Sequence, residues 1–388
     1  MKKRRISGYA ALLIIMLLTG CSQKNDSMET KETTMPTTAV SIEISTEASG
    51  HEGITKFPTE YIIEDGKVKF STEVIAGING IVEPLFIYQA EPVKVVHDKI
   101  YDTFFAQTEL KNTQILDRKN EDGSMGTAYY YHGTAGESLS ILETSFRYYS
   151  QFAFQVLNSF SLEKGQDGYN ADLYQTNKDF LFLSHEDAAK EILEQMKSIG
   201  FELENDDFQY QYYSLDYATL EKEENILNMD GNQDIESYKD EWSEEDNCYY
   251  FCFRQKKDGI PIAYEFANAF SEYNDGNAPV QAMLSKDGLK MLAMDRWFQL
   301  TKTSEQAILL DFEQIASCVA DKFEDLLTET IYDVKRAELI FWVFKDHQGE
   351  YTMKPVWIFD IIEQAEGTEQ EYLLQMMIDA QTGEEIVL

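Results

Sequence analysis

Four oxygen-bearing side chains follow one another at a spacing that could bind a calcium ion. They occupy positions 1, 3, 5 and 12 of a twelve-residue segment: Asp230, Asn232, Asp234 and Glu241. An EF-hand loop supplies ligands from these positions, but it also needs glycine at position six for its sharp turn. Ile235 stands there instead. Because the chain has 69 Asp and Glu residues, a chance match is the alternative interpretation.

The abundant carboxylates could also act in pairs, as the acid and the base or nucleophile of a glycosidase do. No spacing singles out one pair, and the run Glu244-Glu245-Asp246 is typical of a solvated surface. The sequence has no H-E-x-x-H, G-x-S-x-G, P-loop or G-x-G-x-x-G motif, and its five His are scattered. We therefore expect no catalytic residues and no cofactor, with a surface hydrolase of glycan or peptidoglycan as the alternative.

The Cys21 thiol is a different kind of reactive group. It follows Leu18-Thr19-Gly20, an apolar run from Tyr9 and a basic start at residues 2–5. The run has about ten residues, whereas a membrane-spanning helix needs roughly 20, so it indicates an export signal. This order of parts resembles a bacterial lipoprotein signal with its lipobox. The resemblance implies cleavage after residue 20 and acylation of Cys21; an ordinary secreted protein with a cysteine there by chance is the alternative.

The anchor predicts where the protein resides. Acyl chains would hold Cys21 at the extracytoplasmic face of the cell membrane. Residues 21–56 are rich in Thr, Ser and Glu and nearly free of aromatic residues, which predicts a disordered tether. Removing residues 1–20 takes away four basic and no acidic residues, so the formal charge changes from −36 to −40. A chain this acidic is not expected to bind nucleic acid.

The remaining residues predict an α+β fold of antiparallel sheets, each packed by one or two helices, in two or three tandem domains. We expect an N-terminal α+β domain at residues 57–178, a second module at 179–300 and a third at 301–388. In the first, Tyr61–Ile63 and Val68–Ile75 form a hairpin. A helix starts at Pro92, and aromatic strands span residues 129–157. Tyr129 and Tyr131 share one face, which is either sheet core or a ligand-binding groove.

Two helices have clear start signals. Ser184 precedes a helix with Asp187 three residues later, and its apolar face, which begins at Ala188, ends before Gly200. Asp311 is the second cap. We expect His185 to face solvent rather than to bind a ligand. Three cysteines lie beyond Cys21, and Cys248 and Cys252 are too far apart along one strand to form a disulfide with each other. At most one of them could pair with Cys318, and buried, unpaired thiols are expected for all three.

Two segments show a weak internal repeat, each a strand, a tight turn that ends in glycine, and a strand. They are residues 281–292 and 375–386. Together with Gly259–Ile262, Lys354–Trp357 and Ile378–Gly383, they make residues 180–388 resemble PepSY-like modules. The resemblance implies one helix packed on an antiparallel sheet, protease inhibition or regulation of a membrane kinase, and no catalytic residues. We therefore expect a lipid-anchored, non-catalytic module that binds an envelope or wall protein through a sheet edge or aromatic face.

Overall fold

The computed structural model describes residues 54–63, 66–119, 125–162, 168–201, 208–227, 231–264, 278–324, 330–364 and 371–387. Within these ranges the chain is mixed α+β and mostly sheet, with five α-helices, which confirms the predicted class. Residues 51–388 form one compact unit. The predicted signal peptide, Cys21 and nearly all of the predicted tether lie outside the described residues. None of the helices described is both long enough and apolar enough to cross a bilayer.

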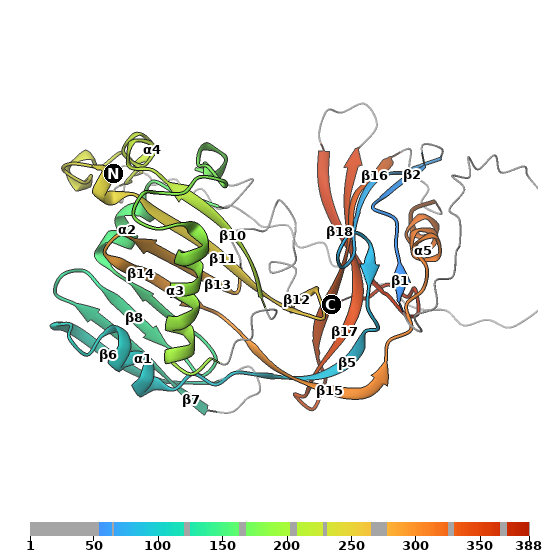
Figure 1. The fold of residues 1–388 in the computed structure, drawn as a ribbon, viewed down its shortest axis with the longest axis horizontal. Coiled ribbons are helices and arrows are strands. Elements are labelled where there is room, and N and C mark those ends of the chain that lie inside the picture. Colours follow the sequence, from blue (N-terminus) through green and yellow to red (C-terminus); the bar gives the residue numbers. More distant parts are fainter. Residues whose placement is uncertain are drawn as a thin grey trace, which may run out of the picture. The chain divides into compact units, whose positions relative to one another are not determined.

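Eight strands form one antiparallel part of the sheet, called section 1 (Figure 1). Their order is β10, β11, β13, β14, β9, β8, β7 and β6. Their bounds, in chain order, are Leu110–Lys119 (β6), Met125–Gly133 (β7), Ser138–Ile141 (β8), Phe146–Tyr149 (β9), Phe208–Leu215 (β10), Cys248–Lys257 (β11), Val280–Ser285 (β13) and Gly288–Met294 (β14).

Eight other strands form section 2, which joins section 1 through the β11–β12 hairpin. Strand β16 pairs antiparallel with β17 and parallel with β3 and β12, so section 2 is a mixed sheet and not the antiparallel one that the sequence predicted. Section 2 contains Glu60–Ile63 (β2), Val68–Ile75 (β3), Phe86–Pro92 (β5), Ile260–Ala263 (β12), Phe298–Gln306 (β15), Ile331–Lys345 (β16), Tyr351–Gln364 (β17) and Glu371–Asp379 (β18). Thr55–Lys56 (β1) and Ile81–Val82 (β4) pair separately.

The helices cover particular sheet faces because each has one apolar side. Residues of α1 (His97–Phe104) and α3 (His185–Ser198) share a buried cluster with section 1. Residues of α2 (Gln151–Leu157) and α4 (Tyr217–Glu223) belong to a second cluster of that section. Helix α5 (Phe312–Glu324) packs on section 2.

The two predicted helix caps are confirmed. The Ser184 hydroxyl accepts a hydrogen bond from the Asp187 N–H at 3.2 Å, and Gly200 ends the turn after α3 with φ +105°. Asp311 accepts from the Gln314 N–H at 2.9 Å. The apolar face of α3, Ala188, Ala189, Ile192, Leu193 and Met196, is buried as predicted.

Two sequence predictions were wrong in detail. Pro92 ends β5, and the helix begins later, at His97. Residues 152–157 are not a strand: they belong to α2, because the Ser150 hydroxyl accepts a hydrogen bond from the Ala153 N–H and caps a helix. The aromatic residues in this segment resemble the pattern of a strand, but the Ser150 cap favours a helix.

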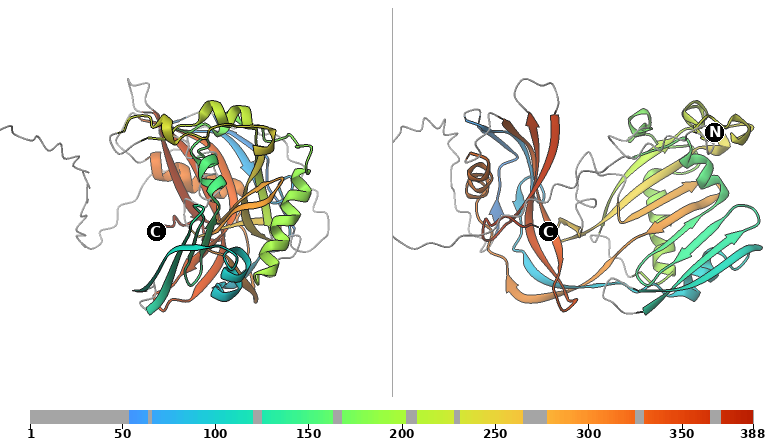
Figure 2. Two further views of the ribbon diagram at one scale, coloured as in Figure 1. Left: turned by 90° about the vertical axis from the view of Figure 1, so that its left-hand side faces the viewer. Right: turned by 180° about the vertical axis from the view of Figure 1, so that it is seen from behind.

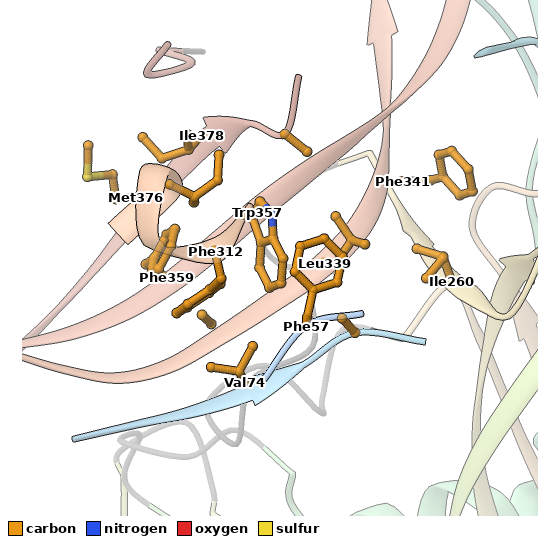
Figure 3. Packing of buried hydrophobic residues seen from close by; sticks show 14 of the residues in the cluster. Phe57, Val74, Ile260, Phe312, Leu339, Phe341, Trp357, Phe359, Met376 and Ile378 are labelled. Atoms are coloured by element: carbon orange, nitrogen blue, oxygen red, sulfur yellow. The ribbon is translucent and has the colours of Figure 1, made fainter. Parts of the chain in front are cut away.

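The centre of section 2 is aromatic. Trp357 is fully buried, and its ring lies 5.1 Å from the rings of both Phe57 and Phe312 (Figure 3). Edge-to-face contacts of this kind are favoured by the ring quadrupoles. Trp357 is therefore a core residue of section 2. The hairpin of β2 and β3 is also confirmed, and it contributes Phe70 and Val74 to the same core.

Strand pairs join segments that are distant in the sequence. Strand β3 pairs with β16, β5 pairs with β15 and β17, and β9 pairs with β14. Hydrogen bonds thus cross each of the predicted domain boundaries, near residues 178 and 300. The division into tandem domains stays a prediction.

Candidate functional site

Strand β6 is the end strand of section 1 and pairs only with β7 within the described chain. All ten of its residues are exposed, including Ile115 at 59% and Leu116 at 51%. Figure 2 shows the teal β6–β7 pair at one end of the section. An unpaired edge presents a row of backbone N–H and C=O groups to which another strand can add. This is the candidate binding site.

Sequence reasoning missed β6, although one signal for it was present. Residues 120–123, Asn-Glu-Asp-Gly, have turn-forming side chains, and the aromatic strand that follows is β7. A hairpin requires a strand before that turn as well. Residues 110–119 mix Lys, Asn, Gln and Asp with isolated apolar residues. Because neither face of this strand is buried, its apolar and polar residues do not need to alternate. The alternation by which a strand is recognised in a sequence is therefore missing.

At the opposite edge, β10 is flanked by an ordered histidine. His185 is the first residue of α3, its Nδ1 lies 2.7 Å from the Asp179 carboxylate, and its ring stacks on Tyr212 with 4.1 Å between centroids. The side chain is 26% exposed, so it faces solvent only in part. The Asp179 carboxylate also accepts a hydrogen bond from the His185 backbone N–H. This hydrogen bond is the main cause that lowers the pKa of Asp179.

Among the described residues, Asp179 is the side chain that hydrogen-bonds to the imidazole of His185. Within the described chain, no serine, threonine or cysteine side chain hydrogen-bonds to His185. The neighbouring Tyr249 hydroxyl accepts from the Phe180 N–H at 2.6 Å and donates to the Leu183 carbonyl at 2.8 Å. Burial raises the pKa of Tyr249 to about 12. These contacts fix the segment before α3 against the sheet.

A small pocket lies at the base of the β6–β7 pair. It encloses about 260 Å³ and is lined by Lys111, Asn112, His132, Gly133, Gly136 and Glu137. Oε2 of Glu137 is buried and has no hydrogen-bond partner among the described residues. A buried carboxylate oxygen without a partner favours a cationic donor. The lining of the pocket itself includes one lysine, Lys111.

Section 2 contains the most enclosed carboxylates. Glu338 and Asp360 are each 4% exposed. Arg336 donates to Glu338 at 2.6 Å, and another of its nitrogens lies 3.7 Å from Asp360. Gln375 donates to Asp360 at 2.8 Å. Burial raises the pKa of Glu338 to about 7, against the opposing effect of Arg336 and Arg254.

These two carboxylates are enclosed by the sheet. A glycosidase needs both groups to reach one substrate bond, whereas Glu338 and Asp360 are each 4% exposed and line neither of two surface pockets, which contain Glu137 and Asp295 respectively. Glu338 and Asp360 instead form a buried ion cluster with Arg336, in which each charge has a partner.

The predicted calcium residues are only partly visible. Asp230 lies outside the described residues. Asp234 accepts a hydrogen bond from the Ser237 hydroxyl at 2.8 Å, and Ile235 begins a short 3₁₀ turn in place of the glycine bend. The described chain has no group of three His, Cys, Asp or Glu placed to hold a metal ion. Calcium binding stays a prediction, as does acylation of Cys21.

The three downstream cysteines are free thiols, as expected. Cys248 and Cys252 are buried, while Cys318 is half-buried. Burial raises the pKa of the Cys248 thiol far above its usual range. It is therefore an inert core group.

No family model matches the sequence, and no curated protein matches it. Among solved structures, an uncharacterized protein from Eubacterium rectale is similar, with a TM-score of 0.57 and 17% identity over 84% of this chain and 92% of that one. The C-terminal domain of Bacillus megaterium YpeB covers 76% of this chain and 96% of its own, with 12% identity and a TM-score of 0.24. The first likeness shows a shared fold; the second score is too low to carry an argument.

Proposed function

We propose that this chain is a lipid-anchored extracytoplasmic protein that binds an envelope or wall protein without catalysing a reaction. In this proposal Cys21 carries the lipid, residues 21–56 act as a tether, and PepSY-like modules form the body. Binding occurs by addition of an extended segment of the partner to strand β6.

The observation that carries the proposal is the exposure of β6. Edge strands in natural proteins are usually short, covered or bent away, whereas this one has ten residues, all of them exposed on both faces. Its neighbour β7 is well anchored, because Tyr131 and Ala128 are buried in section 1. The edge is therefore held in an extended conformation before any partner arrives, which reduces the entropy cost of binding.

Site-specific photo-crosslinking on intact cells tests the binding surface. A photo-reactive amino acid replaces Ile115 on β6 and, in a matched control, the exposed Leu181 in the loop before α3. We expect a crosslink from position 115 to an envelope or wall protein, and none from position 181. Equal products at both positions, or none at position 115, would refute the proposed site.

Membrane fractionation tests the anchor separately. Cys21→Ala removes the only thiol at the lipobox, so the protein should move from the membrane fraction to the soluble fraction. Cys318→Ala is the control, because that thiol lies in α5, and it should leave fractionation unchanged. If the Cys21 variant stayed on the membrane, the lipid-anchor proposal would fail.

A further inference from the structure

We propose that a hollow on section 1, lined by Arg147, Tyr149 and Asp295, binds a small zwitterionic α-amino acid. Arg147 and Tyr149 would hold its carboxylate, and Asp295 would hold its ammonium group. The hollow lies where β13, β14 and β9 pair side by side, and β8 and β7 separate it from β6. The inference therefore goes beyond the proposed function and does not depend on it.

The register of three strands forms the hollow. Gln281 on β13 faces Ala293 on β14, and Ala293 faces Arg147 on β9. Neighbouring strands lie about 4.8 Å apart, so the backbones at Gln281 and Arg147 are about 10 Å apart, with only the methyl group of Ala293 between them. This short side chain leaves a space of about 180 Å³. Drug-sized ligands need about 300 Å³ or more, so the space suits a smaller molecule.

Asp295 lies on the same face of the sheet as Ala293. The β13–β14 ladder continues past the end of β14, because the Asp295 N–H donates to the Pro279 carbonyl at 2.8 Å, and residues two apart on a strand project to one side. Asp295 is therefore a diagonal neighbour of Arg147, at a backbone distance of about 7–8 Å. Its Oδ2 accepts a hydrogen bond from the Tyr264 hydroxyl at 2.9 Å, which leaves Oδ1 for a ligand.

Arg147 and Tyr149 supply hydrogen-bond donors to the same space. Neither the Arg147 guanidinium nor the Tyr149 hydroxyl has a hydrogen bond or an ion pair within the described chain. Burial raises the pKa of Tyr149, against the opposing effect of Arg147, so the hydroxyl keeps its proton at neutral pH. Arg147 is exposed and stays charged. A guanidinium beside a hydroxyl donor is a strong site for a carboxylate.

The opposite wall of the hollow is already ordered. Oε1 of Gln281 accepts a hydrogen bond from the Tyr250 hydroxyl at 2.6 Å, and Tyr250 is buried. Ala278 and Pro279 complete the lining and are also buried. A ligand would therefore meet a wall that needs little further ordering, which reduces the entropy cost of binding. The apolar lining at Ala278 and Pro279 favours a ligand with a small apolar side chain.

The charges select the class of ligand. A simple carboxylate anion would satisfy Arg147, but it would place a second negative charge beside Asp295. It would also approach a chain whose formal charge is −36, which repels anions. A simple amine would place its positive charge beside Arg147. An α-amino acid has both charged groups on one carbon atom and no net charge, so it can contact Arg147 and Asp295 at the same time.

Ligand-observed NMR titration of the full chain tests the chemistry of the ligand. Alanine is compared with N-acetylalanine, which lacks the ammonium group, and with alaninamide, which lacks the carboxylate. We expect saturable binding of alanine, and binding of each analogue that is weaker by about tenfold or more, because each loses a charged hydrogen bond. Failure of alanine to bind, or an analogue that binds as tightly as alanine, would overturn the inference.

Charge-removing substitutions test the location of the site. Arg147→Gln and Asp295→Asn each change an exposed side chain and should raise the Kd for alanine by about tenfold or more. Arg118→Gln and Asp117→Asn remove the same charges on β6, three strands from β9. At about 0.15 M salt the Debye length is about 8 Å, so these controls should leave the Kd within about twofold of the parent. Equal losses in the pocket variants and their controls would refute the site.

Ala293→Leu tests the hollow without changing a charge. The leucine side chain would fill the space between Gln281 and Arg147 and should abolish saturable binding of alanine. Ala293→Ser keeps the space and is the matched control, with a Kd close to that of the parent. Urea unfolding shows whether the Leu variant folds, and the Arg147 and Asp295 variants decide the question if it does not. A folded Leu variant that binds alanine as the parent does would overturn the inference.

Discussion

The two edges of section 1 belong to one antiparallel sheet but differ in cover. Strand β10 is bridged by the preceding segment, because the Ser214 N–H donates to the Gln175 carbonyl at 2.7 Å. The imidazole of His185 covers Tyr212 on one face. Strand β6 has neither a bridging segment nor a covering helix among the described residues, and all of its side chains are exposed.

The difference shows that an edge is closed by nonlocal packing rather than by the strand's own residues. Ser214 and Tyr212 are ordinary strand residues, and they are covered because α3 and the segment before it are fixed to the sheet. The charged residues of β6 and the irregularity between Leu110 and Asn112 protect this edge against unspecific pairing. If this interpretation is correct, substitutions at the β10 side should affect stability, and those at β6 should affect binding.

The largest expected contrast is between two isoleucines. Ile192→Ala removes a fully buried side chain of α3 and should lower the free energy of unfolding by about 2–5 kcal/mol. Ile115→Ala on β6 should change it by less than about 0.5 kcal/mol. Urea unfolding of the full chain measures both. An equal loss from Ile115→Ala would contradict the view of β6 as structurally unsupported.

The next contrast concerns two tyrosine hydroxyls. Tyr249→Phe leaves the Phe180 N–H and the Leu183 carbonyl without their shared partner and should cost about 1–3 kcal/mol of unfolding free energy. Tyr130→Phe on β7 is the control, because the described residues give its hydroxyl no hydrogen bond. Urea titration should show almost no effect of the control. Two similar losses would mean that the Tyr249 contacts do not fix the β10 side.

The cap of α3 should have a smaller effect. Ser184→Ala removes the hydrogen bond to the Asp187 N–H and should cost about 1 kcal/mol in thermal or urea unfolding. Ser184→Asp retains a capping oxygen and should stay close to the parent. If the Asp variant lost as much as the Ala variant, the serine would matter for a reason other than capping.

The smallest expected effect depends on acid. The His185 N–H and imidazole lower the pKa of Asp179 below its unfolded value of 3.8. The unfolded state therefore binds the proton first, so this stabilisation is present above pH 3.8 and is lost as the pH falls through the lower, folded pKa. The unfolding free energy of the parent should fall more between pH 5 and about 2.5 than that of Asp179→Asn. Parallel pH curves would show that Asp179 does not stabilise the α3 end.

Local signals predicted the local parts of the fold. The caps Ser184 and Asp311 and the final turn, where Asp379 accepts the Gln381 and Thr382 N–H groups and Gly383 has φ +75°, follow from residues a few positions apart. The open edge at β6 could not be predicted in this way, because the exposure of a strand depends on whether distant parts of the chain pack over it.

The buried ion cluster was equally invisible in the sequence. Arg336 and Glu338 are two residues apart on β16, but Asp360 and Gln375 reach them from β17 and β18. Nothing in an acidic composition marks two carboxylates out of 69 as buried. Which carboxylates become buried depends on the register in which the strands pair. That register is set by the whole sheet and cannot be read from one segment of the sequence.

The parallel pairing of β3 with β16 bears on how the chain matures. Ser71 donates to Asp333 across a sequence separation of 262 residues, and the two strands align from Val68 to Ile75. A nascent chain that has not yet extended past Ile331 cannot complete this ladder, and such distant contacts make folding slow. Section 2 therefore closes only after synthesis is nearly finished, and a ribosome stalled earlier would release a polypeptide with β3 exposed to chaperones and proteases.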